Sequence, residues 1–134
     1  MGITIFSKKE FNSFYTLETR WNDMDSMGHI NNSTYLTYYE SARVDLFKQY
    51  NYKKIPFIVA SIKVNYLKQL HHPSILHIGN KINKIGNTSF DIKSAIFNNN
   101  EQSASSTAII TCVSYDYIKQ KPILVPDEIK DLIY

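Results

Sequence analysis

Hydrophobic and polar positions follow a helical period in one segment of the chain, between Asn32 and Gln49. The positions that share one face step by four, three, four and three residues: Tyr35, Tyr39, Ala42, Leu46 and Gln49. No Pro or Gly interrupts the segment, and Asn31, Asn32 and Ser33 are all candidates for its N-cap. Flanking apolar residues widen the hydrophobic arc, so the pattern predicts a long helix that other elements surround.

Alternating hydrophobic positions predict strands on both sides of this helix. A short strand is expected before it, over Thr16–Trp21. Four strands are expected after it, over about 58–66, 76–82, 90–96 and 103–117. Turns are expected at 71–74, 86–87 and 98–100, because these segments hold Pro, Gly-Asn or a run of Asn. A tail from Lys121 to Tyr134 is expected to end in a short helix from Asp127.

The predicted element order is β-α-β-β-β-β. It indicates an α+β fold in which one long central helix packs against a curled antiparallel sheet of about five strands. Successive strands joined by tight turns are expected to be antiparallel neighbours. A sheet that covers one helix leaves its edges open, which favours an oligomer, most simply a two-fold dimer. With 134 residues, the chain is expected to form a single domain, 1–134.

Composition excludes several classes of protein. The chain is 43% hydrophobic and 20% charged, which fits a folded core, and its net charge of +3 includes no block of basic residues typical of nucleic-acid binding. Cys112 is the single cysteine, so an intrachain disulfide is excluded and a small buried side chain is expected. No segment approaches the ~20 apolar residues of a membrane span. Met1–Glu10 lacks the pattern of a signal peptide, so a cytoplasmic protein without membrane attachment is expected.

The residues that could take part in a reaction are concentrated just before the predicted helix. Asp23 and Asp25 precede Gly28, His29, Asn31 and Asn32. A helix start presents free N–H groups and a partial positive charge, which can polarise a carbonyl whose oxygen becomes negative during a reaction. A nearby carboxylate can attack that carbonyl or deprotonate a water molecule that does so. The segment therefore suits acyl transfer or hydrolysis, although acidic residues before a helix also serve simply as caps.

No metal site is expected. The spacing Asp23-x-Asp25-x-x-Gly28 begins like a calcium loop, but Met27 and Thr34 stand where such a loop needs an oxygen ligand and a glutamate. The adjacent residues His71 and His72 have no acidic or thiol partner at ligand spacing.

The sequence resembles the hot-dog-fold thioesterases, and more closely the acyl-CoA thioester hydrolase branch of the 4-hydroxybenzoyl-CoA thioesterase family. The likeness rests on Arg20–Tyr35, which continues into Tyr38–Arg43, and on the later stretches Ser61–Leu67 and Ile85–Phe90. These stretches occur in the family's order and spacing, and together they extend over almost the whole chain.

The resemblance implies a helix wrapped by an antiparallel sheet, with active sites at the interface of a homodimer or homotetramer. It implies that Asp25 cleaves an acyl-CoA thioester as nucleophile or general base, and that the backbone N–H of Asn32 binds the thioester carbonyl. Gly28, His29, Asn31 and Tyr35 are expected to bind substrate. No cofactor is expected, because coenzyme A is part of the substrate, and acyl carrier protein is an alternative carrier of the acyl group.

One departure bears on the substrate. The 4-hydroxybenzoyl-specific enzymes carry Pro-Ala-Gly after the aspartate pair, whereas this chain has Ser26–His29, which favours aliphatic acyl groups.

Two alternative functions stay open. One is a hot-dog hydratase or dehydratase that uses Asp25 and His29, although the Asn-Pro of the hydratase signature is absent. The other is a non-catalytic acyl-CoA-binding module in which Asp25 only caps the helix. Asp23 is expected to be structural.

Overall fold

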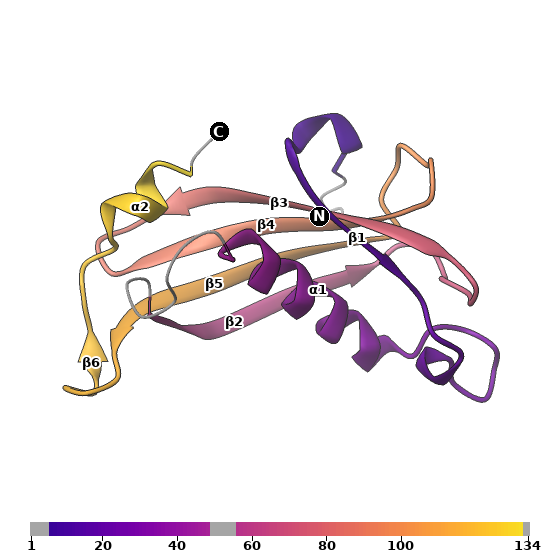
Figure 1. Cartoon of the computed structure of the whole chain (residues 1–134), viewed down its shortest axis with the longest axis horizontal. Coiled ribbons are helices and arrows are strands. Elements are labelled where there is room, and N and C mark those ends of the chain that lie inside the picture. The colour runs from indigo at the N-terminus through magenta and orange to yellow at the C-terminus, as the bar shows by residue number, and fades with distance from the viewer. Residues whose placement is uncertain (1–5, 49–55, 133–134) are drawn as a thin grey trace.

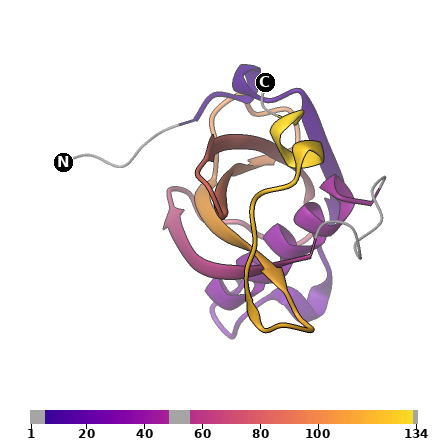
Figure 2. The same cartoon turned by 90° about the vertical axis from the view of Figure 1, so that its left-hand side faces the viewer.

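The computed structural model describes residues 6–48 and 56–132 (Figure 1). The helix α1 (Asn32–Leu46) lies against one face of a curved antiparallel sheet, and Figure 2 shows the sheet curling around it. The strands are β1 (Ser13–Glu18), β2 (Phe57–Tyr66), β3 (Ile75–Ile85), β4 (Ser89–Asn98), β5 (Ser106–Asp116) and β6 (Lys121–Pro122). Two short 3-10 helices, η1 (Lys8–Glu10) and η2 (Trp21–Asp23), flank β1, and α2 (Asp127–Lys130) follows β6. The expected α+β hot-dog arrangement is confirmed.

The strand order is β1-β3-β4-β5-β2, with β6 paired to β5. The expectation that the four later strands are neighbours in chain order is therefore wrong for β2, which pairs with β5 from Phe57–Ser114 to Tyr66–Ser106. A tight turn joins β3 to β4, as expected, whereas residues 99–105 connect β4 to β5 and residues 67–74 connect β2 to β3. This connection crosses the sheet, so β2 and β3 do not form a hairpin and lie apart in the strand order.

Several element boundaries differ from the expected ones. The first strand ends at Glu18 instead of Trp21, because the chain turns into η2 there. The helix ends at Leu46, and Gln49 lies outside the described residues. The last long strand begins at Ser106 instead of Ser103, and β6 forms where only a tail was expected. A register shift between Val59 and Ser61 breaks the predicted alternation of β2, since one extra residue moves later side chains to the other face.

The core lies between α1 and the concave face of the sheet. From α1, the buried apolar side chains are Tyr35, Tyr38, Tyr39, Ala42 and Leu46, and isoleucines of β3, β4 and β5 pack beneath them. The hydroxyl of Tyr39 shares a 2.7 Å hydrogen bond with Ser106 Oγ, which ties the middle of α1 to β5. No helix within residues 6–48 and 56–132 has the length and apolar character needed to cross a membrane.

Candidate active site

The chain between η2 and α1 closes into a small loop around Asp25. The carboxylate oxygen Oδ1 of Asp25 accepts N–H hydrogen bonds from Met27 (2.9 Å) and His29 (3.2 Å). The backbone N–H of Asp25 donates to the His29 carbonyl at 2.7 Å, and Gly28 donates to the Asp25 carbonyl at 3.2 Å. Gly28 has φ = 85°, a conformation that glycine adopts without the cost of a side chain. Within the described residues, Oδ2 of Asp25 accepts no hydrogen bond and is therefore the oxygen available for chemistry.

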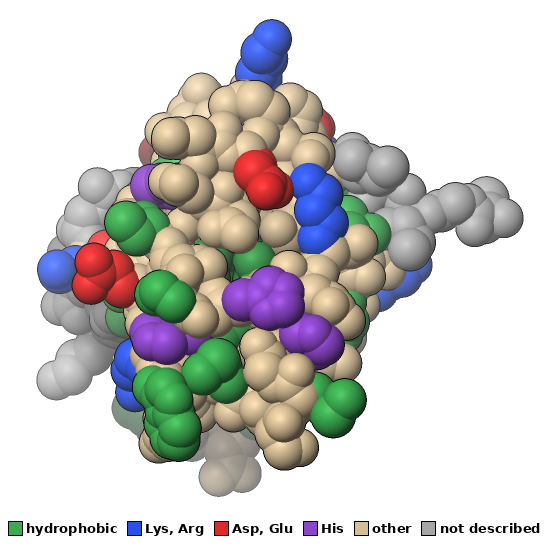
Figure 3. Space-filling view, turned by 90° about the vertical axis from the view of Figure 1, so that its right-hand side faces the viewer, with side chains coloured by type: hydrophobic (Ala, Val, Ile, Leu, Met, Phe, Trp, Pro, Cys, Tyr) green, Lys and Arg blue, Asp and Glu red, His purple; other side chains and the backbone are tan. Residues whose placement is uncertain are grey.

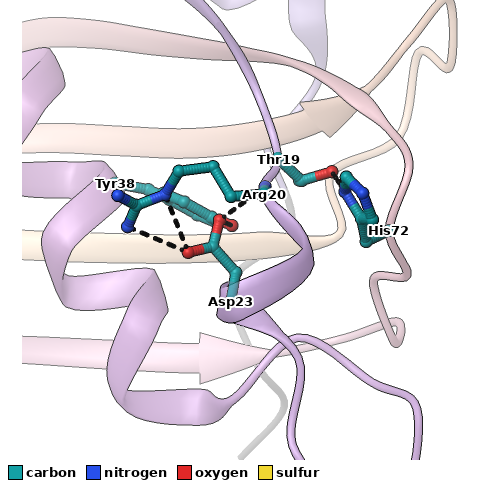
Figure 4. A network of polar contacts seen from close by, with 5 residues as sticks. All are labelled: Thr19, Arg20, Asp23, Tyr38 and His72. Atoms are coloured by element: carbon teal, nitrogen blue, oxygen red, sulfur yellow. Dashed lines mark hydrogen bonds and ion pairs between the residues drawn. The ribbon is translucent and has the colours of Figure 1, made fainter.

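Asp23 anchors this loop to α1. It is 3% exposed, and its carboxylate accepts hydrogen bonds from the Arg20 backbone N–H (2.9 Å), Arg20 Nη2 (3.0 Å) and the Tyr38 hydroxyl (2.5 Å), as Figure 4 shows. Burial raises the pKa of Asp23, but the hydrogen bonds from Tyr38 and Arg20 outweigh it and hold the pKa below its ordinary value. The expected structural role of Asp23 is confirmed.

The start of α1 leaves one amide unpaired. Asn31 is the N-cap: its Oδ1 accepts the Ser33 N–H at 2.9 Å, and its carbonyl accepts the Thr34 N–H at 2.9 Å. The Asn32 N–H has no acceptor among the described residues. The hydroxyl of Tyr66 donates to the Asn32 carbonyl at 3.1 Å and so fixes this first helical residue. A free N–H at a helix start, which also carries partial positive charge, can bind a developing oxyanion.

A cavity of about 440 Å³ brings the expected residues together. Its lining includes Asp25, His29, Asn31, Asn32 and Tyr35, which are five of the six predicted site residues. Gly28 does not line the cavity and contributes through its backbone instead.

Tyr66 and Lys68 are among the lining residues of this cavity that the sequence did not predict. Tyr66 packs edge-on against Tyr35 with ring centroids 4.9 Å apart, and Lys68 reaches Glu101 (3.1 Å) and Ser103 Oγ (2.6 Å). Nothing in the sequence places the end of the strand that carries Tyr66 beside the helix start.

A second cavity is larger, at about 880 Å³. It is bounded by the end of β1, the start of β3 and the turn after β4, and its lining includes Glu18, His72 and Glu101 but not Asp25. The lining of this larger cavity includes neither Asp25 nor Asn32, so the smaller cavity is the candidate active site. No cluster of three or more potential metal-ligating side chains occurs in residues 6–48 and 56–132.

Cys112 lies in the core on β5, as expected. Burial raises the pKa of its thiol to about 12, so it stays protonated and is a poor nucleophile.

Comparison with known proteins identifies the family of this chain. Residues 19–133 match the model of the Thioesterase-like superfamily. The chain belongs to this superfamily. Membership confirms the expected resemblance to hot-dog acyl-CoA thioesterases and the expectation that the chain is a thioesterase enzyme.

Three individual proteins illustrate what this chain is similar to. The long-chain acyl-CoA thioesterase FadM of Escherichia coli K12 is 26% identical over 121 residues, which cover 86% of this chain and 92% of FadM. The uncharacterized protein YsmA of Bacillus subtilis 168 is 32% identical over 89 residues, which cover 63% of this chain but only 60% of YsmA. The crystal structure of PA5185 from Pseudomonas aeruginosa PAO1 has a TM-score of 0.88 at 21% identity, covering 97% of this chain and 94% of PA5185. Acyl-CoA thioesterase activity is thus supported at the level of the family.

Proposed function

We propose that this chain hydrolyses aliphatic acyl-CoA thioesters to the free acid and coenzyme A, with Asp25 as the reacting carboxylate. One observation carries the proposal: the unengaged oxygen Oδ2 of Asp25 and the unpaired N–H of Asn32 belong to residues that line the same cavity. A carboxylate and an oxyanion-binding amide are the two groups that hydrolysis of a thioester requires.

The Asn32 amide binds the thioester carbonyl. As the carbonyl carbon becomes tetrahedral, negative charge grows on its oxygen, and the N–H at the start of α1 stabilises that charge more than it stabilises the uncharged substrate. The Tyr66 hydrogen bond to the Asn32 carbonyl holds this peptide in place. The paired rings of Tyr35 and Tyr66 supply an apolar wall for the adjoining acyl carbons.

Asp25 acts by one of two routes. As a nucleophile, Oδ2 forms a bond to the carbonyl carbon and expels the coenzyme A thiolate, which takes up a proton, and water then hydrolyses the mixed anhydride and restores the carboxylate. As a general base, Oδ2 takes a proton from a water molecule that attacks the same carbon, and the tetrahedral intermediate then breaks its C–S bond and releases the coenzyme A thiolate, which takes up that proton. In both routes the N–H groups of Met27 and His29 hold Oδ1 and thereby aim Oδ2.

The active enzyme is a dimer in this proposal. β2 is the outermost strand at its end of the sheet, and its exposed apolar side chains include Val59, Ile62 and Tyr66. Leu36 and Val44 of α1 are also exposed, at 42% and 49%. Antiparallel pairing of β2 with the same strand of a second copy would cover the open edge and give an isologous interface. Because Tyr66 also lines the candidate active site, the second copy would close the cavity around Asp25, which is exposed in the single chain.

Release of free thiol from acyl-CoA substrates of different chain lengths tests this function. We expect turnover without added metal or cofactor, and at least a ~100-fold lower kcat for Asp25→Asn, which is the low end of acid–base catalysis. Hydration of enoyl-CoA without thiol release would instead indicate a hydratase. Binding of acyl-CoA with neither reaction would indicate a binding module. Turnover of acyl carrier protein thioesters alone would show that the acyl group is carried by that protein instead of coenzyme A, with the same hydrolysis at Asp25.

A further inference from the structure

One peptide group connects the carboxylate of Asp25 to a histidine on another segment. The N–H of the Gly28–His29 peptide, which belongs to His29, donates to Asp25 Oδ1 at 3.2 Å. The carbonyl of the same peptide, which belongs to Gly28, lies 3.2 Å from Nδ1 of His71. A peptide group is planar, so its N–H and C=O must turn together. The contact with His71 therefore sets the direction of an N–H that holds the carboxylate.

This contact also fixes the tautomer of His71. A carbonyl oxygen can only accept a hydrogen bond, so Nδ1 of His71 carries the proton and donates it. The His71 ring also packs edge-on against the His29 ring, with centroids 5.0 Å apart and planes at 69°. Figure 3 shows histidine side chains gathered at the end of the molecule where α1 begins. Because His29 lines the active-site cavity, His71 supports both the backbone and a side chain of the loop of Asp25.

The loop needs such a support. Gly28 has φ = 85°, and a Cβ built there would meet no atom within 4 Å, so packing does not restrain the tip of the loop. The segment that carries His71 is itself anchored to the end of β1. Thr19 Oγ1 accepts the Ser74 N–H at 2.9 Å and lies 2.8 Å from Nδ1 of His72, a pair that Figure 4 shows.

We propose that His71 is a positioning residue for hydrolysis: its Nδ1–H orients the Gly28–His29 peptide and so aims the Asp25 carboxylate at the substrate. Sequence alone predicts only a turn at His71. The proposal rests on the proposed function of Asp25, because an aimed carboxylate matters for rate only if Asp25 reacts.

Two substitutions separate the donor from the ring. In His71→Asn, the side-chain NH₂ takes the place of Nδ1–H and keeps the donor, whereas His71→Phe keeps an aromatic ring without a donor. We expect His71→Phe to lower kcat about tenfold, equivalent to losing one hydrogen bond in the transition state, with KM within about twofold of the native value. His71→Asn should recover most of that loss. His77→Phe is the matched control, since His77 on β3 contacts Thr16 and not the loop, and its kcat should be unchanged.

The inference is overturned if all three variants turn over like the native enzyme, or if His71→Asn and His71→Phe lose activity equally. A second measurement needs no catalysis. At pH 8.5, nitrogen-15 NMR of the intact protein should show the proton of His71 on Nδ1, and the His29 amide should exchange faster in His71→Phe. A proton on Nε2 would refute the contact. An Asp25→Asn variant with native activity would refute the proposed function and leave these two observations standing.

Discussion

The hydroxyl of Tyr38 lies 2.5 Å from Oδ2 of Asp23, which joins the second turn of the central helix to the turn that precedes the loop of Asp25. Asp23 also accepts hydrogen bonds from Arg20, so the one buried carboxylate of this region holds η2 and α1 in a fixed relation. The next two residues lead directly into the loop, and its geometry therefore depends on this network.

Replacing Tyr38 by phenylalanine should destabilise the fold. The substitution removes a hydrogen bond to a buried charged group, and such bonds contribute about 1.5–3 kcal/mol. Urea unfolding at pH 7 would measure the loss of free energy. Tyr117→Phe is the control, because the Tyr117 hydroxyl bonds the Phe57 carbonyl at an exposed position. An equal loss in both variants would contradict the role given to Asp23.

The effect of Tyr38→Phe should depend on pH. Since the folded pKa of Asp23 lies below its ordinary value of 3.8, the carboxylate stabilises the fold at every pH well above 3.8. That contribution is lost as the pH falls through the lower folded pKa, because Asp23 is then protonated in both states. The difference in unfolding free energy between native and variant proteins should therefore be full at pH 7 and shrink below pH 3.8. A difference that grows in acid would contradict this account.

Cys112 should be inert in the folded protein. Its thiol has a pKa raised to about 12 by burial, so almost no thiolate exists at pH 8. Incubation with iodoacetamide at that pH should leave the native protein unlabelled and fully active, whereas urea-unfolded protein should be alkylated at this cysteine. Inactivation of the native protein in step with labelling would implicate the thiol in catalysis.

A charge on β2 should break the proposed dimer. Ile62 is 37% exposed on this edge strand, and Ile62→Lys would place an ammonium group in the proposed interface. We expect the dimer dissociation constant to rise at least about tenfold, a change of about 1.4 kcal/mol, and activity to fall with the dimer fraction. Sedimentation at several concentrations would measure this. Ile118→Lys, at a 94% exposed residue in the turn between β5 and β6, should leave the assembly intact. A fully active native monomer would contradict a shared active site.

Local sequence was sufficient to predict much of the fold. The helical period from Asn32, the N-cap candidates and the Gly86–Asn87 hairpin depend on residues close in the chain, and the structure has all three. The partner of β2 could not be predicted in this way. Pairing of β2 with β5 is set by the crossing of residues 67–74 and by long-range packing. The alternation of hydrophobic residues along a strand does not indicate which strand it pairs with.

The candidate site also has a part that local sequence predicts and a part that it does not. Asp25, His29, Asn31 and Asn32 are near neighbours in sequence, so a single segment predicted that they lie together. Tyr66 and Lys68 reach the cavity only because β2 ends beside the start of α1. This proximity arises from the tertiary fold, and no residue pattern near Tyr66 predicts it. Gly28 belongs to the same segment, and its positive φ and its N–H bond to the Asp25 carbonyl close the loop, while its expected contact with substrate stays a prediction.

The central claim is that the carboxylate of Asp25 reacts with the thioester. Asp25→Asn tests it most directly, because the asparagine Oδ1 can still accept the N–H groups of Met27 and His29 and so preserve the loop. The decisive measurement is kcat for release of thiol from acyl-CoA by the folded variant. The account predicts a kcat at least ~100-fold below the native value with unchanged unfolding free energy, and a folded variant that retains native kcat would contradict it.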